Sequence, residues 1–171
     1  NACAAVAAAH HVGVPAAVAC QALTQFSGVK RRLELRGEPG GIRVYDDFAH
    51  HPTAIQITLE GLRASSPAGR LIAVIEPRSN TMRSGIHGQR LASATAAADQ
   101  VFWYQPPGLD WSLERIVVES NPSAAVVSDL DALVQAVASE AAPGDAVVIM
   151  SNGGFGGFHE RLLAALTAKS A

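Results

Sequence analysis

The chain has 171 residues, of which 49% are hydrophobic, and its formal net charge is −2 with an isoelectric point near 6.3. This length suits one domain of ordinary size, and the hydrophobic fraction is ample for a core. The near-neutral charge gives no electrostatic case for nucleic acid, because no basic stripe with interleaved aromatic residues is present.

An alanine-rich segment covers residues 1–23. Two histidines, a glycine and a proline interrupt it well short of the roughly 20 apolar residues that a membrane span needs, and no charged signal-peptide segment precedes it. We therefore expect two helices, over residues 1–11 and 15–26, and no membrane partner. Cys3 and Cys20 lack C-x-x-C spacing, which fits a reducing, cytoplasmic setting.

Beyond this segment, strand-like and helical patterns alternate. We expect strands over residues 32–36, 42–46, 70–76, 100–104, 124–127 and 146–150, helices over 52–64, 88–97, 130–141 and 158–168, and a less regular stretch over 111–119. Alternation of this kind predicts an α/β, Rossmann-like domain with a mostly parallel sheet and helices on both faces. Ligands of such sheets bind outside the carboxyl ends of the strands.

A glycine-rich run follows the last expected strand. Ser151 and Asn152 lead into Gly153 and Gly154, and two more glycines follow before a helical pattern resumes. Glycine lets backbone N–H groups approach a ligand closely, and the next helix N-terminus favours an anion. The run therefore predicts an anion-binding loop, although a tight turn without a ligand is the simpler alternative. It matches neither of the familiar nucleotide-binding fingerprints.

A second polar run, at the end of an earlier expected strand, contains Asp46, Asp47, His50 and His51. Paired histidines can accept or give protons near neutral pH, and adjacent carboxylates need polar partners to stay ionised. A zinc site is the rival interpretation, but sequential histidines rarely complete a tetrahedral site and the cysteines are not suitably spaced, so we predict no metal ligand here. In a purely structural alternative, Asp47 is a turn acid and His51 packs against the next residue, Pro52.

A third polar run places Arg78, Asn80 and Arg83 after the strand expected over residues 70–76. Guanidinium groups bind carboxylates in two-pronged fashion, so this loop is suited to an acidic ligand. In the alternative, these arginines only pair with Glu76 or Asp99 at the surface. Because all three polar runs follow expected strands, they should meet at one edge of the sheet.

Residues 45–55, 76–82 and 150–157 together resemble the Mur ligases, ATP-dependent enzymes that join amino acids or peptides to UDP-N-acetylmuramate. The resemblance covers nearly the whole chain. It implies that residues 1–36 end the central ATP-binding domain and that residues 37–171 form the Rossmann-like C-terminal domain. The N-terminal domain and the rest of the central domain would be further partners within the same protein.

The resemblance also implies a reaction. The implied reaction is catalysed by an ATP-dependent ligase of peptidoglycan recycling, which joins the tripeptide L-alanyl-γ-D-glutamyl-meso-diaminopimelate to UDP-N-acetylmuramate. ATP would phosphorylate the lactyl carboxylate, and the tripeptide amine would attack the acyl phosphate. The Mg²⁺ ligands are expected mainly in the central domain. Because these residues contain no Gly-Lys-Thr phosphate-binding loop, we expect the chain by itself to be inactive.

Site residues follow from the same resemblance. Asn1 would contact adenine, Arg32 and Asp46 would hold the ribose, and His50 and His51 would lie near the γ-phosphate and the incoming amine. The residues expected to bind the tripeptide are Arg78, Asn80, Arg83, Ser151, Asn152, Gly153, Gly154, Phe155 and Gly156. A non-catalytic nucleotide- or peptide-binding module is the competing class, and a zinc hydrolase is a more remote one.

Overall fold

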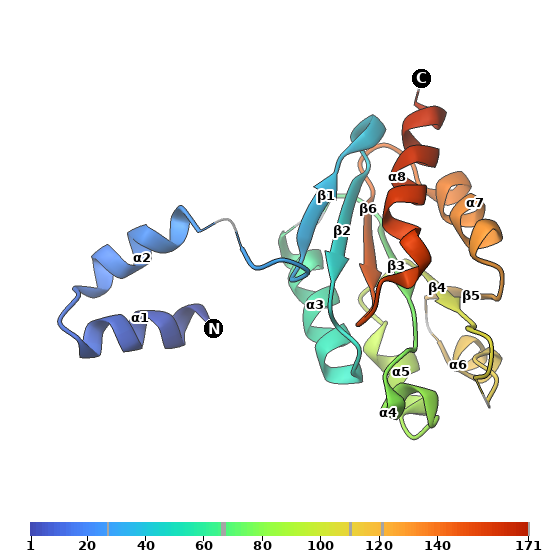
Figure 1. Ribbon diagram of the computed structural model, residues 1–171, viewed down its shortest axis with the longest axis horizontal. Coiled ribbons are helices and arrows are strands. Elements are labelled where there is room, and N and C mark those ends of the chain that lie inside the picture. Colours follow the sequence, from blue (N-terminus) through green and yellow to red (C-terminus); the bar gives the residue numbers. More distant parts are fainter. Residues whose placement is uncertain (27, 66–67, 110, 121, 171) are drawn as a thin grey trace.

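The computed structural model describes residues 1–26, 28–65, 68–109, 111–120 and 122–170, and only the backbone of residue 89. Its chain forms a pair of helices, α1 (Ala2–His11) and α2 (Ala16–Thr24), and a larger domain built on a sheet. The helical pair projects to one side of the sheet domain (Figure 1). Among the described residues, no helix combines the length and apolarity needed to cross a bilayer.

The sheet has six strands in the order β1-β2-β6-β3-β4-β5. These are β1 (Glu34–Gly37), β2 (Arg43–Asp47), β3 (Leu71–Ile75), β4 (Gln100–Tyr104), β5 (Ser123–Val127) and β6 (Ala146–Met150). Strand β1 pairs with β2 in antiparallel fashion, and every other pairing is parallel. The predicted α/β class and mostly parallel sheet are therefore confirmed.

Helices cover both faces of the sheet (Figure 1). On one face lie α3 (Pro52–Ser65), α5 (Gly88–Ala94) and α6 (Glu114–Glu119), and on the other lie α7 (Leu130–Glu140) and α8 (Phe158–Lys169). All five residues of β3 and all five of β6 are buried, because alternate side chains enter opposite layers of the core. Burial on both faces explains why these strands read as continuous apolar runs.

Three short elements differ from the expected loops. Helix α4 (Asn80–Arg83) forms inside the third polar run, where the side chain of Ser79 accepts a hydrogen bond from Met82 N at 3.3 Å and Met82 is buried. The 3₁₀ turns η1 (Pro39–Gly41) and η2 (Phe155–Gly157) each contain two glycines with positive φ. Residues of such short helices carry no periodic signal in the sequence.

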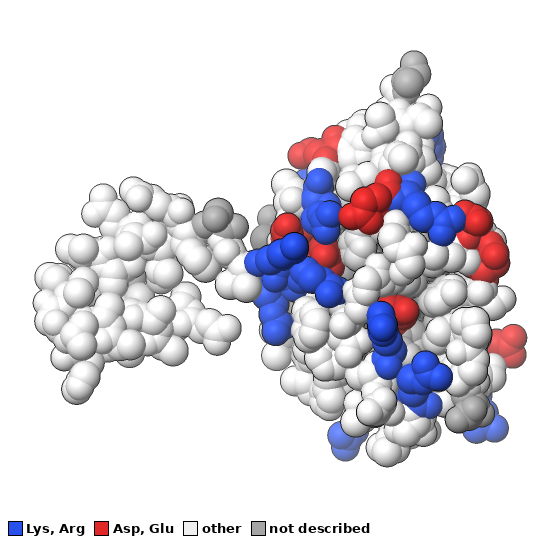
Figure 2. All heavy atoms as spheres, in the orientation of Figure 1, with Lys and Arg blue, Asp and Glu red and all other residues white. Residues whose placement is uncertain are grey.

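The helical pair is poorly buried and uncharged. Ala19 is its one buried residue among those described, and residues 1–26 contain no Lys, Arg, Asp or Glu, so the pair is white in Figure 2. Strand β1 begins at Glu34 and is hydrogen-bonded into the sheet, so the sheet domain includes residues before the expected boundary at 36.

Candidate functional site

The three polar runs meet at the carboxyl edge of the sheet. Ser151 N donates to Asp47 O at 3.1 Å, and Glu76 N donates to Met150 O at 3.0 Å. These bonds connect the ends of β2, β6 and β3, which are neighbours in the sheet. The expected convergence is therefore confirmed, and it follows from the parallel register of these strands.

The loop after β6, residues 151–157, is called the glycine loop below. Ser151 is fully buried, its hydroxyl donates to Glu76 Oε2, and it accepts from Gly153 N at 2.9 Å. Phe155, Gly156 and Gly157 have φ angles of 45°, 57° and 73°. Glycine adopts such angles without steric cost, which accounts for two glycines of the run.

Phe155 turns its side chain into the core. It is 1% exposed, and its ring stacks on Phe158 with centroids 5.0 Å apart. Only its backbone can therefore face a ligand. A non-glycine residue with positive φ is strained, and the buried ring offsets part of that cost.

Arg31 binds the backbone of the glycine loop. Its Nη2 donates to Ser151 O at 2.5 Å and to Gly153 O at 2.8 Å. Arg31 was not among the residues expected at this site. The only signal was the run of three basic residues before the first strand, and Lys and Arg side chains gather where this segment meets the sheet domain (Figure 2).

Asp46 is enclosed by cationic groups. Its side chain is 2% exposed, with Arg31 Nε at 3.3 Å and Arg36 Nη1 at 3.4 Å from Oδ2. His159 Nε2 lies 3.1 Å from Oδ1 but is not aligned for a hydrogen bond. Arg32, the residue expected beside Asp46, is exposed and lies over the ring of Phe48 instead.

His159 extends this cluster into α8. Burial lowers the pKa of His159, and the Arg36 guanidinium lowers it further, while the Asp46 carboxylate opposes both effects. A buried imidazole is costly to charge, so the neutral form is favoured despite the nearby carboxylate. No sequence motif pointed to this histidine.

Asp47 has a structural role. Its carboxylate accepts from Leu33 N and Ala49 N, both at 2.8 Å, and from Thr58 Oγ1 at 3.3 Å. These bonds fix the chain on both sides of β2. The interpretation of Asp47 as a turn acid is therefore confirmed.

The two adjacent histidines have different surroundings. His50 is half-buried, with Nδ1 2.8 Å from Phe48 O and its ring edge-on to Phe48 at 5.1 Å. His51 is exposed, its carbonyl accepts from Ile55 N in the first turn of α3, and its ring lies edge-on to His87 at 4.8 Å. Among the residues described, no three or more His, Cys, Asp or Glu are grouped to hold a metal ion.

Arg78 lies against the glycine loop. A Cβ added to Gly153 would be 1.7 Å from Arg78 Nη1 and 2.4 Å from its guanidinium carbon, so the guanidinium occupies the space that a side chain there would need. Arg78 is exposed, and its guanidinium makes no hydrogen bond or ion pair with another described residue. Glu76 accepts from Ser151 and Asp99 pairs with Arg63, and neither carboxylate pairs with Arg78 as the surface alternative had it.

The remaining expected residues lie further away. Arg83 Nη2 donates to Gly108 O at 2.8 Å, and Trp111 Nε1 donates to Arg83 O at 2.9 Å, so Arg83 faces the β4–α6 connection. Asn80 is exposed at the start of α4. Asn1 lies on the helical pair, away from the carboxyl edge of the sheet (Figure 1).

A cleft of about 860 Å³ lies between the start of α5 and α6. Its lining includes His87, Arg90, Trp111 and Arg115. The ring contact between His51 and His87 connects this cleft to the end of β2. The cleft therefore borders the second and third polar runs, and no residue of the glycine loop lines it.

Comparison with known proteins identifies the family. The family described as "Mur ligase, glutamate ligase domain" matches residues 31–153. The UDP-N-acetylmuramate–L-alanyl-γ-D-glutamyl-meso-2,6-diaminoheptandioate ligase of Escherichia coli K12 is 49% identical over 167 residues, which cover 97% of this chain and 36% of that protein. The chain thus spans little more than a third of this relative.

Solved structures agree. A murein peptide ligase from Psychrobacter arcticus 273-4 is 48% identical, with a TM-score of 0.75 over 95% of this chain and 35% of that chain. A UDP-N-acetylmuramate–alanine ligase from Thermotoga maritima is 20% identical, with a TM-score of 0.82 over 98% of this chain and 37% of that chain, and supports the fold alone. The matched residues, the sequence identity and the fold agree, and the chain belongs to the Mur ligase family.

Proposed function

We propose that this chain forms the peptide-binding part of an ATP-dependent ligase that joins L-alanyl-γ-D-glutamyl-meso-diaminopimelate to UDP-N-acetylmuramate in peptidoglycan recycling. Its relative in Escherichia coli is named for a ligation of these compounds. The observation that carries the proposal is the position of Arg78, an exposed guanidinium without a partner among the described residues, directly against Gly153.

The peptide subsite consists of Arg78 and the glycine loop. A peptide ending in glutamate and diaminopimelate presents several carboxylates, and a guanidinium beside backbone N–H groups is suited to bind them. The backbone of residues 151–156 contributes, while the side chain of Phe155 remains in the core. Asn80 and Arg83 lie on the same short helix and would contact the far end of the peptide.

The nucleotide subsite lies on the side of the helical pair. Arg32 and Asp46 would meet the ribose, Asn1 would meet adenine, and His50 and His51 would flank the reacting groups. An exposed guanidinium at Arg32 is chemically suited to hydroxyl or phosphate oxygens. ATP would supply the activation of the lactyl carboxylate, and the Mg²⁺ ligands would belong mainly to the central domain.

The domain arrangement is part of the same proposal. The helical pair would end the central domain, and the C-terminal domain would start close to the family match at residue 31 and not at 37. The protein would act in the cytoplasm, where the exposed thiols of Cys3 and Cys20 stay reduced.

Phosphate release tests the proposal. The full-length protein that contains this chain should release phosphate from ATP only when both UDP-N-acetylmuramate and the tripeptide are present. This chain alone should bind the tripeptide without releasing phosphate. Full-length protein that binds nucleotide or peptide without turnover would instead indicate a non-catalytic module, and zinc-dependent hydrolysis would indicate the remote alternative.

A further inference from the structure

We propose that Arg31 is a positioning residue that orients the backbone of the glycine loop to bind a carboxylate of the peptide. This inference rests on the proposed function for the identity of the ligand. The geometry of the loop itself supports the orienting role. Arg31 is the described residue whose side chain bonds both to this loop and to the end of β2.

The first step concerns the direction of two peptide groups. Arg31 Nη2 binds the carbonyls of Ser151 and Gly153, at 2.5 and 2.8 Å. In a planar trans peptide the C=O and the following N–H point in opposite directions, and no described peptide bond is cis. The N–H groups of Asn152 and Gly154 therefore point away from Arg31.

The second step concerns what those N–H groups can bind. Neither Asn152 N–H nor Gly154 N–H donates to a described residue. Two free donors separated by one residue can bind the oxygens of an anion, as backbone N–H groups do in other anion-binding loops. Arg78 lies against Gly153, between the two donors in sequence, and adds a positive charge. A carboxylate is the ligand that these three groups fit.

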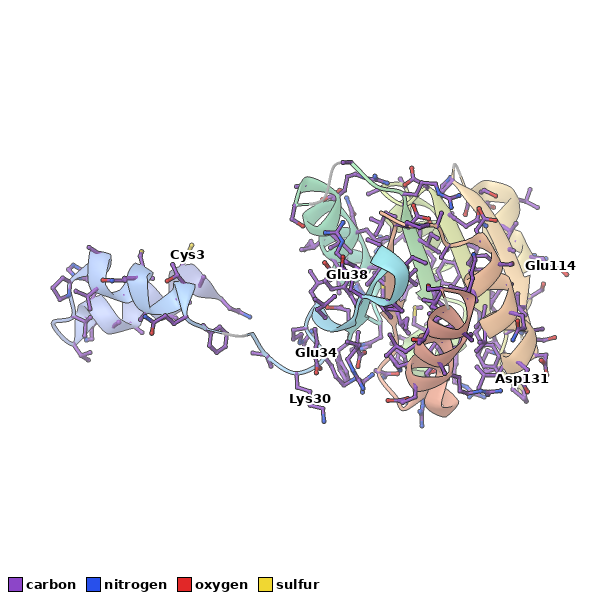
Figure 3. All side chains as sticks on the ribbon, turned by 90° about the horizontal axis from the view of Figure 1, so that it is seen from above. Cys3, Lys30, Glu34, Glu38, Glu114 and Asp131 are labelled. Atoms are coloured by element: carbon purple, nitrogen blue, oxygen red, sulfur yellow. The ribbon has the colours of Figure 1, made fainter. Side chains whose placement is uncertain are left out.

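The third step concerns how Arg31 is held. Its own N–H donates to Glu34 Oε2 at 2.8 Å, its carbonyl accepts from Phe48 N at 2.9 Å, and its Nε lies 3.3 Å from Asp46 Oδ2. Its φ of 58° is strained for a non-glycine residue and persists only because these contacts fix it. Figure 3 shows Lys30 and Glu34, which flank Arg31 in the sequence, where the chain enters the sheet domain.

Amide hydrogen exchange of this chain tests the orienting role. Arg31→Lys keeps the charge but cannot hold two carbonyls in the same fixed geometry. Exchange at Gly153 and Gly157, whose N–H groups are bonded within the loop, should become roughly tenfold faster, the factor that corresponds to about 1.4 kcal/mol.

Arg36→Lys is the matched control. Arg36 has a similarly exposed side chain, 27% against 25%, and also contacts Asp46, but it makes no contact with the glycine loop. In Arg36→Lys, amide exchange at Gly153 and Gly157 should stay within twofold of the wild-type rate. Equal acceleration in both variants would overturn the assignment.

A second variant distinguishes the effect of losing the Arg31 guanidinium from the effect of backbone strain at this position. Arg31→Gly removes the guanidinium while suiting the positive φ. It should also accelerate exchange in the loop, and unchanged exchange would refute the proposal. In the full-length ligase, Arg31→Lys should raise the KM for tripeptide about tenfold, with the KM for ATP close to that of Arg36→Lys. Faster exchange in a protein without ligase activity would refute the proposed function but retain the orienting role.

Discussion

Replacing Gly153 by alanine should displace the Arg78 side chain from the glycine loop while leaving Arg78 itself unchanged in the sequence. The new Cβ would lie 1.7 Å from Nη1, 2.4 Å from Cζ and 2.7 Å from Cδ of Arg78, so the arginine must leave its place against the loop. Gly153 is not among the glycines with positive φ, so alanine fits its backbone. The free energy of unfolding should therefore change by less than about 0.5 kcal/mol.

The cost should appear in catalysis. If Arg78 binds a peptide carboxylate, losing a charged hydrogen bond costs about 1.5–3 kcal/mol. That range corresponds to roughly a 10- to 150-fold decrease in kcat/KM for tripeptide. Arg78→Ala should cost about the same, and the double variant should cost little more than either single variant, because both changes remove one contact.

The assay is kcat/KM for tripeptide in the full-length ligase, measured for the wild type, the two single variants and the double variant. Thermal unfolding of each protein checks that the fold is retained. If Gly153→Ala is as harmful in the Arg78→Ala background as in the wild type, the alanine acts on the loop itself. The reasoning about Arg78 would then be wrong.

Three other outcomes are expected. Arg78→Lys removes the planar guanidinium and should reduce the preference for tripeptide over L-alanyl-γ-D-glutamate, whereas an unchanged kcat/KM ratio would show that Arg78 does not read the third residue. Asp46→Ala should raise the KM for ATP more than the KM for tripeptide, and equal changes in both KM values would give Asp46 another role. The same substitution should lower the free energy of unfolding by about 1–3 kcal/mol, because Arg31 and Arg36 lose their buried partner. Because burial lowers the pKa of His159, the unfolded chain binds the proton first and stability should fall as the pH drops below about 6.5. His159→Gln should flatten that dependence in urea unfolding at pH 5.5 and 7.5, and a slope equal to that of the wild type would exclude His159 as its source.

The strands and their convergence could be predicted from the sequence. Gln100–Tyr104 and Ala146–Met150 have the expected bounds, because strands buried on both faces stand out as unbroken apolar runs. The meeting of the three polar runs followed from topology alone, since parallel strands place their carboxyl ends at one edge.

The side-chain partners could not be predicted in the same way. Arg31 and Arg32 are chemically identical neighbours, yet Arg31 binds the glycine loop while Arg32 is exposed, and Arg31 and Leu33 have positive φ. Non-glycine residues give no sequence signal for that conformation. His159 lies 113 residues from Asp46, so no local pattern could pair them.

The burial of the Phe155 side chain could not be predicted either. Four glycines around it suggested an exposed loop, yet its ring fills the core beside Phe158. Asn80–Arg83 was expected as part of a loop because a helix of four residues shows no periodicity.

The position of β6 between β2 and β3 also bears on how such a protein can diverge. The five residues of β6 are buried, while the connections that form the candidate site follow the ends of β2, β3 and β6. Selection for a new substrate can therefore act on the connections and leave the strands alone. The converse also holds: a shift of β6 by a single residue would exchange the two faces of its side chains and displace the glycine loop that follows it. Substitutions are thus tolerated best in the connections at the rim of the sheet and least in the buried strand β6.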